Sequence, residues 1–509
     1  MTMDIVKRSV LALAVALAAG LAAVVAAQPQ LTELQAAVRE RPEDAEAWTR
    51  LGNAAYEGGD LETAKDAYLE AVALDYLLGD AHYGLGLVEY ARGDYQAALF
   101  AFNEVTRLFP DRFDGHYNRA VTLATLRRPS ESAAAFRAAL GAAEPEATQL
   151  DRLNAHVGLA GQLVRTGDYA AAAASFGDAL AIRPDDIDLA YNRGAALVAA
   201  DRGLEALAEL TDVEARSGDY RFSVLIAEVY VEQGQVDFAL RALERAVRKA
   251  REASDRVGEA RSLVALGELQ RGLGREREAA ASFERAAEVD PASWEARYNL
   301  GTSLLAAGQP RAALAPLQEA ARMQENGIES ELALAGTLDQ LGMTAEAIAS
   351  ARRVLERSTP SDTEAQTQAR FIVGRGLYLR GDYAGAEEAF AKVVQARPSS
   401  ASAQLWAGLA QYMQGDFQSA AQFYERAVQL DPNSIEARVN LAAAYLASER
   451  FGDAAEVYRL LVQQNPQDAE SHFNLGWSLY ALQRDEDARI AWSAACQLGH
   501  QAGCTAPRQ

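Results

Sequence analysis

The sequence predicts an all-α protein, a solenoid of about 13 helix-turn-helix units stacked in chain order. Three observations lead to this fold class. A set of small and aromatic residues returns with a period of 34 residues. Within each unit, apolar residues fall at i, i+3, i+4 and i+7, which is the stripe of an amphipathic helix. Glycine and aspartate separate the two stripes of a unit, and proline closes many units, so turns and helix ends recur in register.

The composition is that of a folded and acidic protein. Hydrophobic residues make up 50% of the 509 residues and charged residues 24%, which argues against a disordered chain. The 49 Lys and Arg residues face 71 Asp and Glu residues, for a formal net charge of −22. Such a chain has no general electrostatic attraction for DNA, RNA or anionic membranes. Length alone would suggest about three ordinary domains, but the internal repeats override that expectation.

The first element is a leader, residues 1–27. Lys7 and Arg8 precede an uncharged apolar run, and small residues then stand before Gln28, which is the layout of a cleaved secretory signal peptide. The alternative is an uncleaved N-terminal anchor, because the run of 19 residues approaches the ~20 needed to span a bilayer. In both cases we expect the rest of the chain to be exported, to a periplasm or cell envelope.

Each repeated unit carries three landmarks: a glycine in its first helix, a Gly-Asp-aromatic triplet at its turn, and a proline near its end. The first-helix glycines are Gly52, Gly86, Gly301 and Gly408. The turn triplets begin at Gly93, Gly167, Gly381 and Gly415. The closing prolines are Pro110, Pro184, Pro291, Pro398, Pro432 and Pro466. Because one hairpin cannot bury its apolar stripe alone, such units must stack on one another.

This set of positions resembles the tetratricopeptide repeat (TPR) family, in its exported bacterial form, over nearly the whole chain after the leader. The resemblance implies a right-handed superhelix. Its repeats are expected to begin at Ala45, Gly79, Phe113, Leu153, Ile187, Tyr220, Ala260, Trp294, Ile328, Thr367, Ala401, Ile435 and Ala469. Residues 28–44 fit only the second helix of a repeat and are expected to form an N-terminal capping half-repeat. The array then covers residues 45–502, and residues 503–509 form a C-terminal tail.

Three repeats depart from the regular spacing. The third has Arg127 in place of the turn glycine and runs long. The sixth continues into the charged, helix-favouring segment 248–259, which we expect to extend its second helix. The ninth contains Ser358 to Asp362, expected to form a loop or a slightly longer helix end. We expect a change of superhelical pitch, or a break into sub-blocks, near residues 150, 255 and 362.

The sequence contains no catalytic constellation. It has no Walker-type glycine loop, no HExxH and no GxSxG, so we predict a protein that is not an enzyme and that needs no cofactor or metal. Four of the five histidines share the fourth repeat position, where the family usually has Trp: His82, His116, His156 and His472. Equivalent residues of adjacent repeats lie ~8–10 Å apart, whereas metal ligands converge within ~2 Å of the ion. We therefore interpret these histidines as packing residues.

The first helices supply the candidate binding surface. In the family, positions 2, 5, 6, 9 and 12 of this helix line the concave groove. Position 6 is asparagine in five repeats, and one more asparagine stands at position 9 of the first: Asn118, Asn192, Asn299, Asn440, Asn474 and Asn53. Position 5 is often aromatic, as in Tyr83, Tyr117, Tyr191, Tyr298 and Phe473. Position 12 adds Tyr56, Tyr90, Tyr378, Tyr412 and Tyr480.

These residue types suit the binding of an extended polymer. An amide group both donates and accepts hydrogen bonds, so asparagine can pair with a peptide backbone without reading its sequence. Tyrosine adds flat area with a polar tip. The alternative interpretation is that Asn and Tyr are simply common at these positions of the family.

The two cysteines, Cys496 and Cys504, lie at the end of the last repeat. Their spacing resembles the paired cysteines of the cysteine-rich helical-hairpin repeats related to TPR. This resemblance implies a disulfide that ties the last helix to the segment after it, and an exported compartment permits one. Two free thiols are the alternative.

The sequence therefore predicts a non-enzymatic TPR scaffold of the bacterial cell envelope that binds protein partners, through extended peptide segments, in its groove. The alternative is a periplasmic TPR subunit of a polysaccharide export assembly, with a glycan in the groove. The carboxylate clamp of chaperone-binding TPR proteins is excluded, because it needs Lys at position 5 and the chain has only four lysines. We expect no nucleic-acid partner, and membrane contact only through an uncleaved leader.

Overall fold

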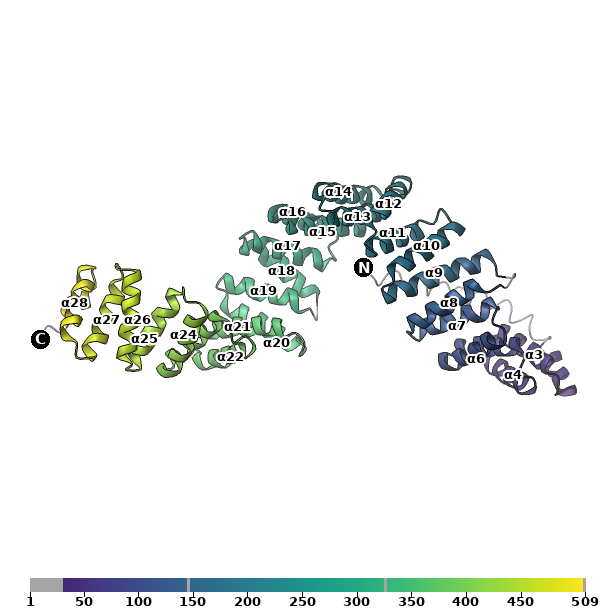
Figure 1. Cartoon of the computed structure of the whole chain (residues 1–509), viewed down its shortest axis with the longest axis horizontal. Helices are drawn as coiled ribbons and strands as arrows, with labels where there is room; N and C mark the ends of the chain where they lie inside the picture. Colours follow the sequence, from purple (N-terminus) through teal and green to yellow (C-terminus); the bar gives the residue numbers. More distant parts are fainter. Residues whose placement is uncertain (1–30, 144–146, 325–326, 507–509) are drawn as a thin grey trace. The chain divides into compact units, whose positions relative to one another are not determined.

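The computed structural model describes residues 31–143, 147–324 and 327–506, and every regular element in these ranges is an α-helix (Figure 1). The predicted all-α fold class and the repeated helix-turn-helix arrangement are confirmed. The predicted leader, residues 1–27, lies outside the described residues. Among the described helices, none combines the length and the hydropathy that a membrane crossing requires.

The helices alternate as the first and second helices of 13 repeats. The first helices are α3 (Ala45–Glu57), α5 (Gly79–Ala91), α7 (Phe113–Thr125), α9 (Gln149–Thr166), α11 (Ile187–Ala199), α13 (Tyr220–Glu232), α15 (Arg256–Gly272), α17 (Trp294–Ala306), α19 (Ile328–Gln340), α21 (Thr363–Leu379), α23 (Ala401–Met413), α25 (Ile435–Ala447) and α27 (Ala469–Ala481). The second helices are α4 (Leu61–Leu74), α6 (Tyr95–Leu108), α8 (Pro129–Gly141), α10 (Tyr169–Ile182), α12 (Gly203–Ser217), α14 (Val236–Glu252), α16 (Glu276–Val289), α18 (Pro310–Met323), α20 (Thr344–Arg357), α22 (Tyr383–Ala396), α24 (Phe417–Leu430), α26 (Phe451–Gln464) and α28 (Asp485–Gln497). A short helix, α29 (Gln501–Thr505), follows α28.

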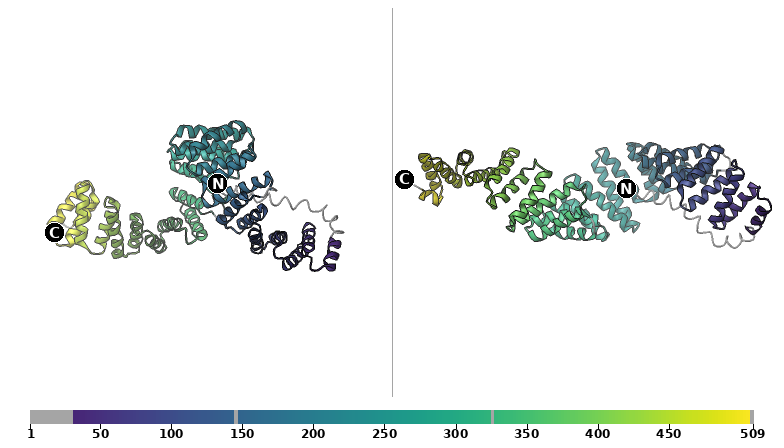
Figure 2. Two further views of the ribbon diagram at one scale, coloured as in Figure 1. Left: turned by 45° about the vertical axis from the view of Figure 1, so that its right-hand side comes forward. Right: turned by 90° about the horizontal axis from the view of Figure 1, so that it is seen from below.

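The chain forms two compact units, residues 1–262 and 263–509, and the division falls inside α15. From α3 to α14, and again from α16 to α29, each helix packs against the next one along the chain (Figures 1 and 2). First helices of neighbouring repeats also touch, as α3 does with α5, α11 with α13, α19 with α21 and α23 with α25. The first helices thus lie side by side as a layer within each unit, which is the arrangement of an α-solenoid.

The Gly-Asp-aromatic triplets form the turns between paired helices. In the second repeat Gly93 takes a positive φ of 84°, a conformation that glycine adopts without steric cost. Asp94 then caps α6 by accepting a hydrogen bond from the Ala97 backbone N–H, and Tyr95 is the first residue of that helix. The triplets at Gly167, Gly381 and Gly415 work in the same way.

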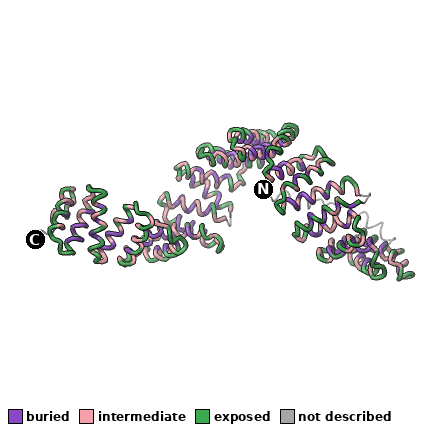
Figure 3. The backbone as a smooth tube through the Cα atoms, viewed as in Figure 1, coloured by how far each residue is buried: buried purple, intermediate pink, exposed green. Residues whose placement is uncertain are grey.

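The first-helix glycines allow the paired helices to approach closely. A Cβ atom added to Gly86 of α5 would lie 2.6 Å from the ring of Phe102 in α6, and one on Gly408 of α23 would lie 2.6 Å from Tyr424 in α24. Phe102 and Tyr424 are each 1% exposed, so the ring of the second helix fills the space that the glycine leaves. Figure 3 shows the resulting pattern, in which buried and exposed stretches alternate along each helix.

The three long repeats take up much of their extra length in the helix that follows. Helices α9, α15 and α21 begin at Gln149, Arg256 and Thr363, one turn before the starts expected from the repeat pattern. The second helix of the sixth repeat is extended as expected, since α14 has 17 residues against 14 in α10. The extension stops at Glu252 rather than Glu259, because Ser254 takes a positive φ of 58°. Near residues 150 and 362 the stack is continuous, since α8 packs on α9 and α20 on α21.

Both ends of the array are covered by short helical segments. Residues 31–40 are helical, and there Leu31, Leu34 and Val38 pack in one cluster with Ala47 and Leu51 of the first repeat. This packing is what a capping segment requires.

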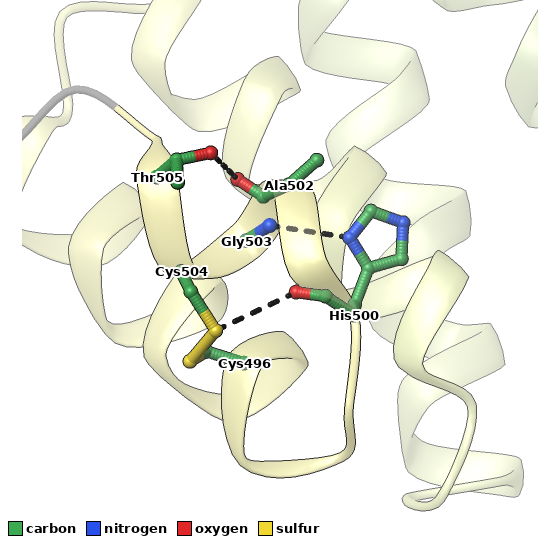
Figure 4. Close-up of a disulfide and its surroundings, with 6 residues drawn as sticks. All are labelled: Cys496, His500, Ala502, Gly503, Cys504 and Thr505. Atoms are coloured by element: carbon green, nitrogen blue, oxygen red, sulfur yellow. Dashed lines mark hydrogen bonds between the residues drawn. A yellow bond between two sulfur atoms is a disulfide. The ribbon is translucent and has the colours of Figure 1, made fainter.

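At the other end the chain turns at Gly499, with a φ of 93°, and returns as α29 (Figure 4). The expected tail therefore starts inside a helix, since Gly503 to Thr505 belong to α29. Cys496 of α28 and Cys504 of α29 are disulfide-bonded with their Cα atoms 4.8 Å apart, the pairing that the resemblance implied.

Candidate binding surface on the first helices

The candidate surface is the layer of first helices in each unit. Residues three and four apart on a helix share a face, so positions 5, 6, 9, 12 and 13 of each first helix lie on one stripe. Because neighbouring first helices lie side by side, the stripes of successive repeats join into a surface. The structure places the predicted asparagines and aromatic residues on this stripe, at differing depths.

The predicted tyrosines at position 5 are largely packing residues. The rings of Tyr83, Tyr117 and Tyr191 meet phenylalanine rings edge-on, with centroids 6.0, 5.7 and 5.8 Å apart. Burial raises the pKa of Tyr83 and of Tyr191 to about 12. The guanidinium of Arg112 lies 4.8 Å from the centre of the Tyr83 ring, and that of Arg221 lies 5.0 Å from the Tyr191 ring. Tyr83 and Tyr117 therefore pack the two helices of their own repeats together, Tyr191 packs its repeat against the next, and all three offer a ligand only part of their surface.

Several predicted asparagines already hold an intramolecular partner. The Asn53 carboxamide oxygen accepts a 2.6 Å hydrogen bond from the Tyr68 hydroxyl. The Asn118 amide nitrogen donates to the Tyr83 hydroxyl, and also to a backbone carbonyl oxygen, both at 3.0 Å. Each of these side chains keeps its other polar atom for a ligand: the nitrogen of Asn53 and the oxygen of Asn118.

The structure separates Asn299 from the rest of the predicted set. Asn299 is 8% exposed, and its oxygen accepts a 3.2 Å hydrogen bond from Arg271 of the preceding repeat. Burial raises the pKa of its neighbour Tyr298. The amide of Asn299 therefore links two repeats and presents little surface to a ligand, whereas Asn192 and Asn440 are half-buried.

The last repeat carries an aromatic cluster, of which only Phe473 and Tyr480 were predicted from the sequence. Phe473 stacks on His500 with ring centroids 4.2 Å apart, and its other neighbour is Trp477. Trp477 and Tyr480 are 39% and 38% exposed, and both rest against the ring of Trp492, at 5.5 and 5.6 Å. Asn474 lies beside them, with its amide 3.4 Å from the Glu470 carboxylate. A tryptophan at position 9 was the signal in the sequence, since no other repeat has one there.

Three of the four position-4 histidines, His82, His116 and His472, are hydrogen-bonded to backbone. The fourth, His156, instead has its Nδ1 atom 3.6 Å from the Asp178 carboxylate. Histidine, tryptophan and glutamine side chains all place a nitrogen near the carbonyl oxygen six residues earlier. The pairs are Trp48 with Pro42 at 2.9 Å, His82 with Tyr76 at 3.0 Å, His116 with Pro110 at 2.8 Å, Gln404 with Pro398 at 3.1 Å and His472 with Pro466 at 3.2 Å. The side chains serve the junction between repeats, as the packing interpretation expects.

Buried carboxylates in the repeats are also paired. Glu331 is 3% exposed, and its oxygens lie 2.7 Å from Arg353 and 3.4 Å from Arg357. Glu228 differs, because it lies at position 9 of α13 on the candidate surface, where burial and then the nearby Glu232 raise its pKa.

Comparison with solved structures returns helical-repeat proteins of low identity. The chain is similar to the structure of Naa15/Naa10 bound to HypK-THB (16% identity, TM-score 0.40, 90% of this chain and 76% of that chain). It is similar to a tetratricopeptide repeat protein from Parabacteroides merdae (19% identity, TM-score 0.35, 48% of this chain and 96% of that chain). It is also similar to the TPR domain of P58(IPK) (18% identity, TM-score 0.28, 80% and 99%). No curated protein sequence matches the chain.

Family models give the assignment. One tetratricopeptide repeat model matches residues 17–76, 61–111, 83–147, 264–328, 332–401 and 373–435, which together span more than half of the chain. Two further tetratricopeptide repeat models match residues 220–292 and 411–472. The chain belongs to the tetratricopeptide repeat family.

Proposed function

We propose that this protein is a non-enzymatic scaffold of the bacterial cell envelope that binds extended peptide segments of partner proteins along its first helices. Membership of the TPR family suggests a protein–protein interaction scaffold. The observation that carries the finer proposal is the layer of side-by-side first helices, with uncharged amide and aromatic groups on its shared stripe.

An extended peptide matches the hydrogen-bonding groups of this layer. Its backbone presents donors and acceptors in alternation, and every one that loses water needs a partner. Tyrosine hydroxyls bind the oxygen of the Asn53 amide and the nitrogen of the Asn118 amide. The nitrogen of Asn53 and the oxygen of Asn118 can therefore bind a peptide backbone. An amide fixed at one end is already oriented, which lowers the entropic cost of binding.

The envelope location rests on the leader at residues 1–27 and on the cysteine pair. A signal-peptide layout directs export, and a disulfide such as the one between Cys496 and Cys504 persists in an oxidising compartment. The two features are independent and support the same location.

A subunit of a polysaccharide export assembly is the second candidate function. The observation that favours it is the exposure of Trp477 and Tyr480, because flat aromatic faces also stack on sugar rings. A glycan would then replace the peptide on the same layer of helices.

The test is partner capture by the double variant Asn192→Ala, Asn440→Ala. Each lost hydrogen bond should weaken binding by about 0.5–1.5 kcal/mol, while the melting temperature stays close to that of the unchanged protein because both amides are half-buried. Cross-linked partners from an envelope extract are quantified by mass spectrometry. Asn433→Ala, an exposed asparagine in the turn before α25, is the matched control. Equal capture by the double variant and the control would contradict the proposal.

A further inference from the structure

We propose that the junction of the fourth and fifth repeats binds a small, uncharged aromatic N-heterocycle that carries a carbonyl oxygen. The site is a cavity of about 450 Å³ bounded by α10, α11 and α12, helices that pack in chain order (Figure 1). Its volume lies within the ~300–1,000 Å³ of small-molecule sites. None of its residues stands at positions 5, 6, 9, 12 or 13 of a first helix, so this inference goes beyond the proposed peptide surface.

The cavity has an apolar lining. Leu210 and Phe222 line it and are 1% and 0% exposed, and half-buried Leu180 and Val213 lie beside them. A flat ring that covers these side chains removes apolar surface from water, with a gain that grows with the area covered. An aromatic ligand therefore suits the cavity better than a flexible polar one.

The charges on the cavity lining are paired. Arg193 lies 3.0 Å from Glu209, an ion pair that joins α11 to α12, and Arg216 lies 3.0 Å from Asp212, one turn earlier on α12. A charged ligand would have to replace one partner of an existing ion pair, whereas an uncharged ligand leaves both pairs in place. The lining therefore favours an uncharged compound.

Three short side chains open the cavity. The equivalent positions at the junction of the second and third repeats carry longer side chains, although the two junctions have the same order of helices. Gly177 stands in place of Asn103, Ala190 in place of His116, and Leu210 in place of Phe136. The asparagine and the histidine make hydrogen bonds at the other junction, which identifies the groups that a ligand can satisfy here.

The Pro184 carbonyl oxygen can accept a hydrogen bond from a ring N–H. In the third repeat Nε2 of His116 lies 2.8 Å from the carbonyl oxygen six residues earlier. In the first repeat the indole N–H of Trp48 donates to the equivalent oxygen at 2.9 Å. Pro184 is that residue for the fifth repeat, where Ala190 has no side-chain donor. An imidazole or indole N–H of a ligand can therefore take the place of the missing side chain.

The Arg193 guanidinium needs a hydrogen-bond acceptor. At the other junction Nε of Arg119 donates a 2.7 Å hydrogen bond to the carboxamide oxygen of Asn103. At the cavity the Arg193 side chain lies against Gly177, with Cζ 3.5 Å from the point where a Cβ atom would stand. Its Nε is buried and has no hydrogen-bond partner among the described residues, which is costly for an N–H group. A carbonyl oxygen of the ligand can accept from it once the side chain turns from Gly177 toward the cavity.

Indole-3-carboxamide combines these properties and is the probe for the test. It is uncharged, and its bicyclic ring carries one N–H and a carboxamide oxygen. We expect saturable binding to the full chain in a titration followed by ligand-observed NMR. Benzofuran-3-carboxamide lacks the ring N–H and 3-methylindole lacks the carbonyl oxygen, so each should bind about fivefold or more weakly, the loss that one hydrogen bond brings.

Variants of the chain locate the site. Gly177→Asn combined with Ala190→His rebuilds the side chains of the other junction and should weaken indole-3-carboxamide about tenfold or more. Ala174→His, exposed on α10 and outside the cavity lining, is the matched control and should leave the affinity unchanged. Melting temperatures close to that of the unchanged protein show that the variants fold. If the double variant does not fold, Ala190→His alone takes its place.

Three results would overturn the proposal. They are the absence of saturable binding to the unchanged protein, an affinity that the cavity-filling variant retains, and equal affinity for benzofuran-3-carboxamide. The second result would place the compound elsewhere on the chain, and the third would remove the hydrogen bond to Pro184. Because none of these measurements uses a peptide, their outcome leaves the proposed scaffold function standing.

Discussion

At the scale of single residues, five repeats share a hydrogen bond from the side chain at position 4 to the backbone carbonyl six residues earlier. His82 is 2% exposed, and its ring nitrogen lies 3.0 Å from the Tyr76 carbonyl oxygen. Trp48 and Gln404 make the same contact in their own repeats. These bonds are exposed or part-buried, so each contributes only about 0.5–1.5 kcal/mol. Repeats with Ala190 or Leu263 at this position have no side-chain donor there, whereas histidine, tryptophan and glutamine all supply one. This explains how histidine can stand where the family usually has tryptophan.

The prediction at the residue scale concerns Glu228. Its pKa is raised by burial and by Glu232, so folding penalises the ionised carboxylate. The penalty is present at neutral pH and vanishes once the pH falls below the ordinary value of about 4.3, where the carboxyl is protonated in both the folded and the unfolded chain. Glu228→Gln should therefore raise the melting temperature at about pH 7, and this gain should shrink toward pH 4.

Exposed Glu244 of α14 supplies the control for that experiment. Glu244→Gln should give no comparable pH-dependent gain. If the Glu228→Gln variant gained the same stability at both pH values, the cause would lie in packing rather than in ionisation.

At the scale of helices and turns, the residue after each first helix sets the quality of the turn. Gly93 takes a positive φ of 84°, whereas Arg127, Asp201 and Glu449, which follow α7, α11 and α25, hold values of 58°, 58° and 60°. A side chain in this conformation costs about 1–2 kcal/mol. The repeats without a turn glycine therefore carry local strain that glycine would relieve.

Arg127→Gly is the corresponding prediction. Glycine adopts the positive φ of this position without strain, and Arg127 is exposed. The relief of about 1–2 kcal/mol of backbone strain should exceed the ~0.5–1 kcal/mol of chain entropy that glycine costs, so the free energy of unfolding should rise. Hydrogen exchange measured by mass spectrometry should slow in α7 and α8. The reciprocal change, Gly93→Arg, should speed exchange in α5 and α6, and faster exchange in the Arg127→Gly variant would contradict the account.

The helices were predictable where turn and capping residues mark their ends in the sequence. The triplet at Gly93 predicts a turn, a cap and a helix start, and α6 begins at Tyr95, the third residue of the triplet. The extra turn of α9 was missed although the sequence signals its start, because Thr148 and Asp151 form a capping box around Gln149 and Leu150. Contacts across repeats were also beyond the pattern: position 6 identifies the face of Asn299, but not its bond to Arg271, 28 residues away. Trp477 was visible in the sequence, yet its exposure depends on how α28 packs Trp492.

At the scale of the whole molecule, each repeat contacts mainly its neighbours in chain order. A substitution in such an array changes stability and binding locally, so its two faces can be probed independently. Second helices also expose large apolar residues, including Leu204 of α12 at 74% and Leu460 of α26 at 53%. Exposure alone therefore does not distinguish the face that binds partners, and the claim that the first helices do so needs a direct measurement.

That measurement is photo-crosslinking in intact cells. A benzophenone amino acid is placed at Ala195 or Ala443, position 9 of α11 and α25, and in parallel at Leu204 or Leu460 on second helices. Partner adducts are then identified by mass spectrometry of the envelope fraction. We predict adducts from the two first-helix positions and none from the two second-helix positions. Adducts that form from Leu204 and Leu460 but not from Ala195 and Ala443 would show that the first helices are not the binding surface.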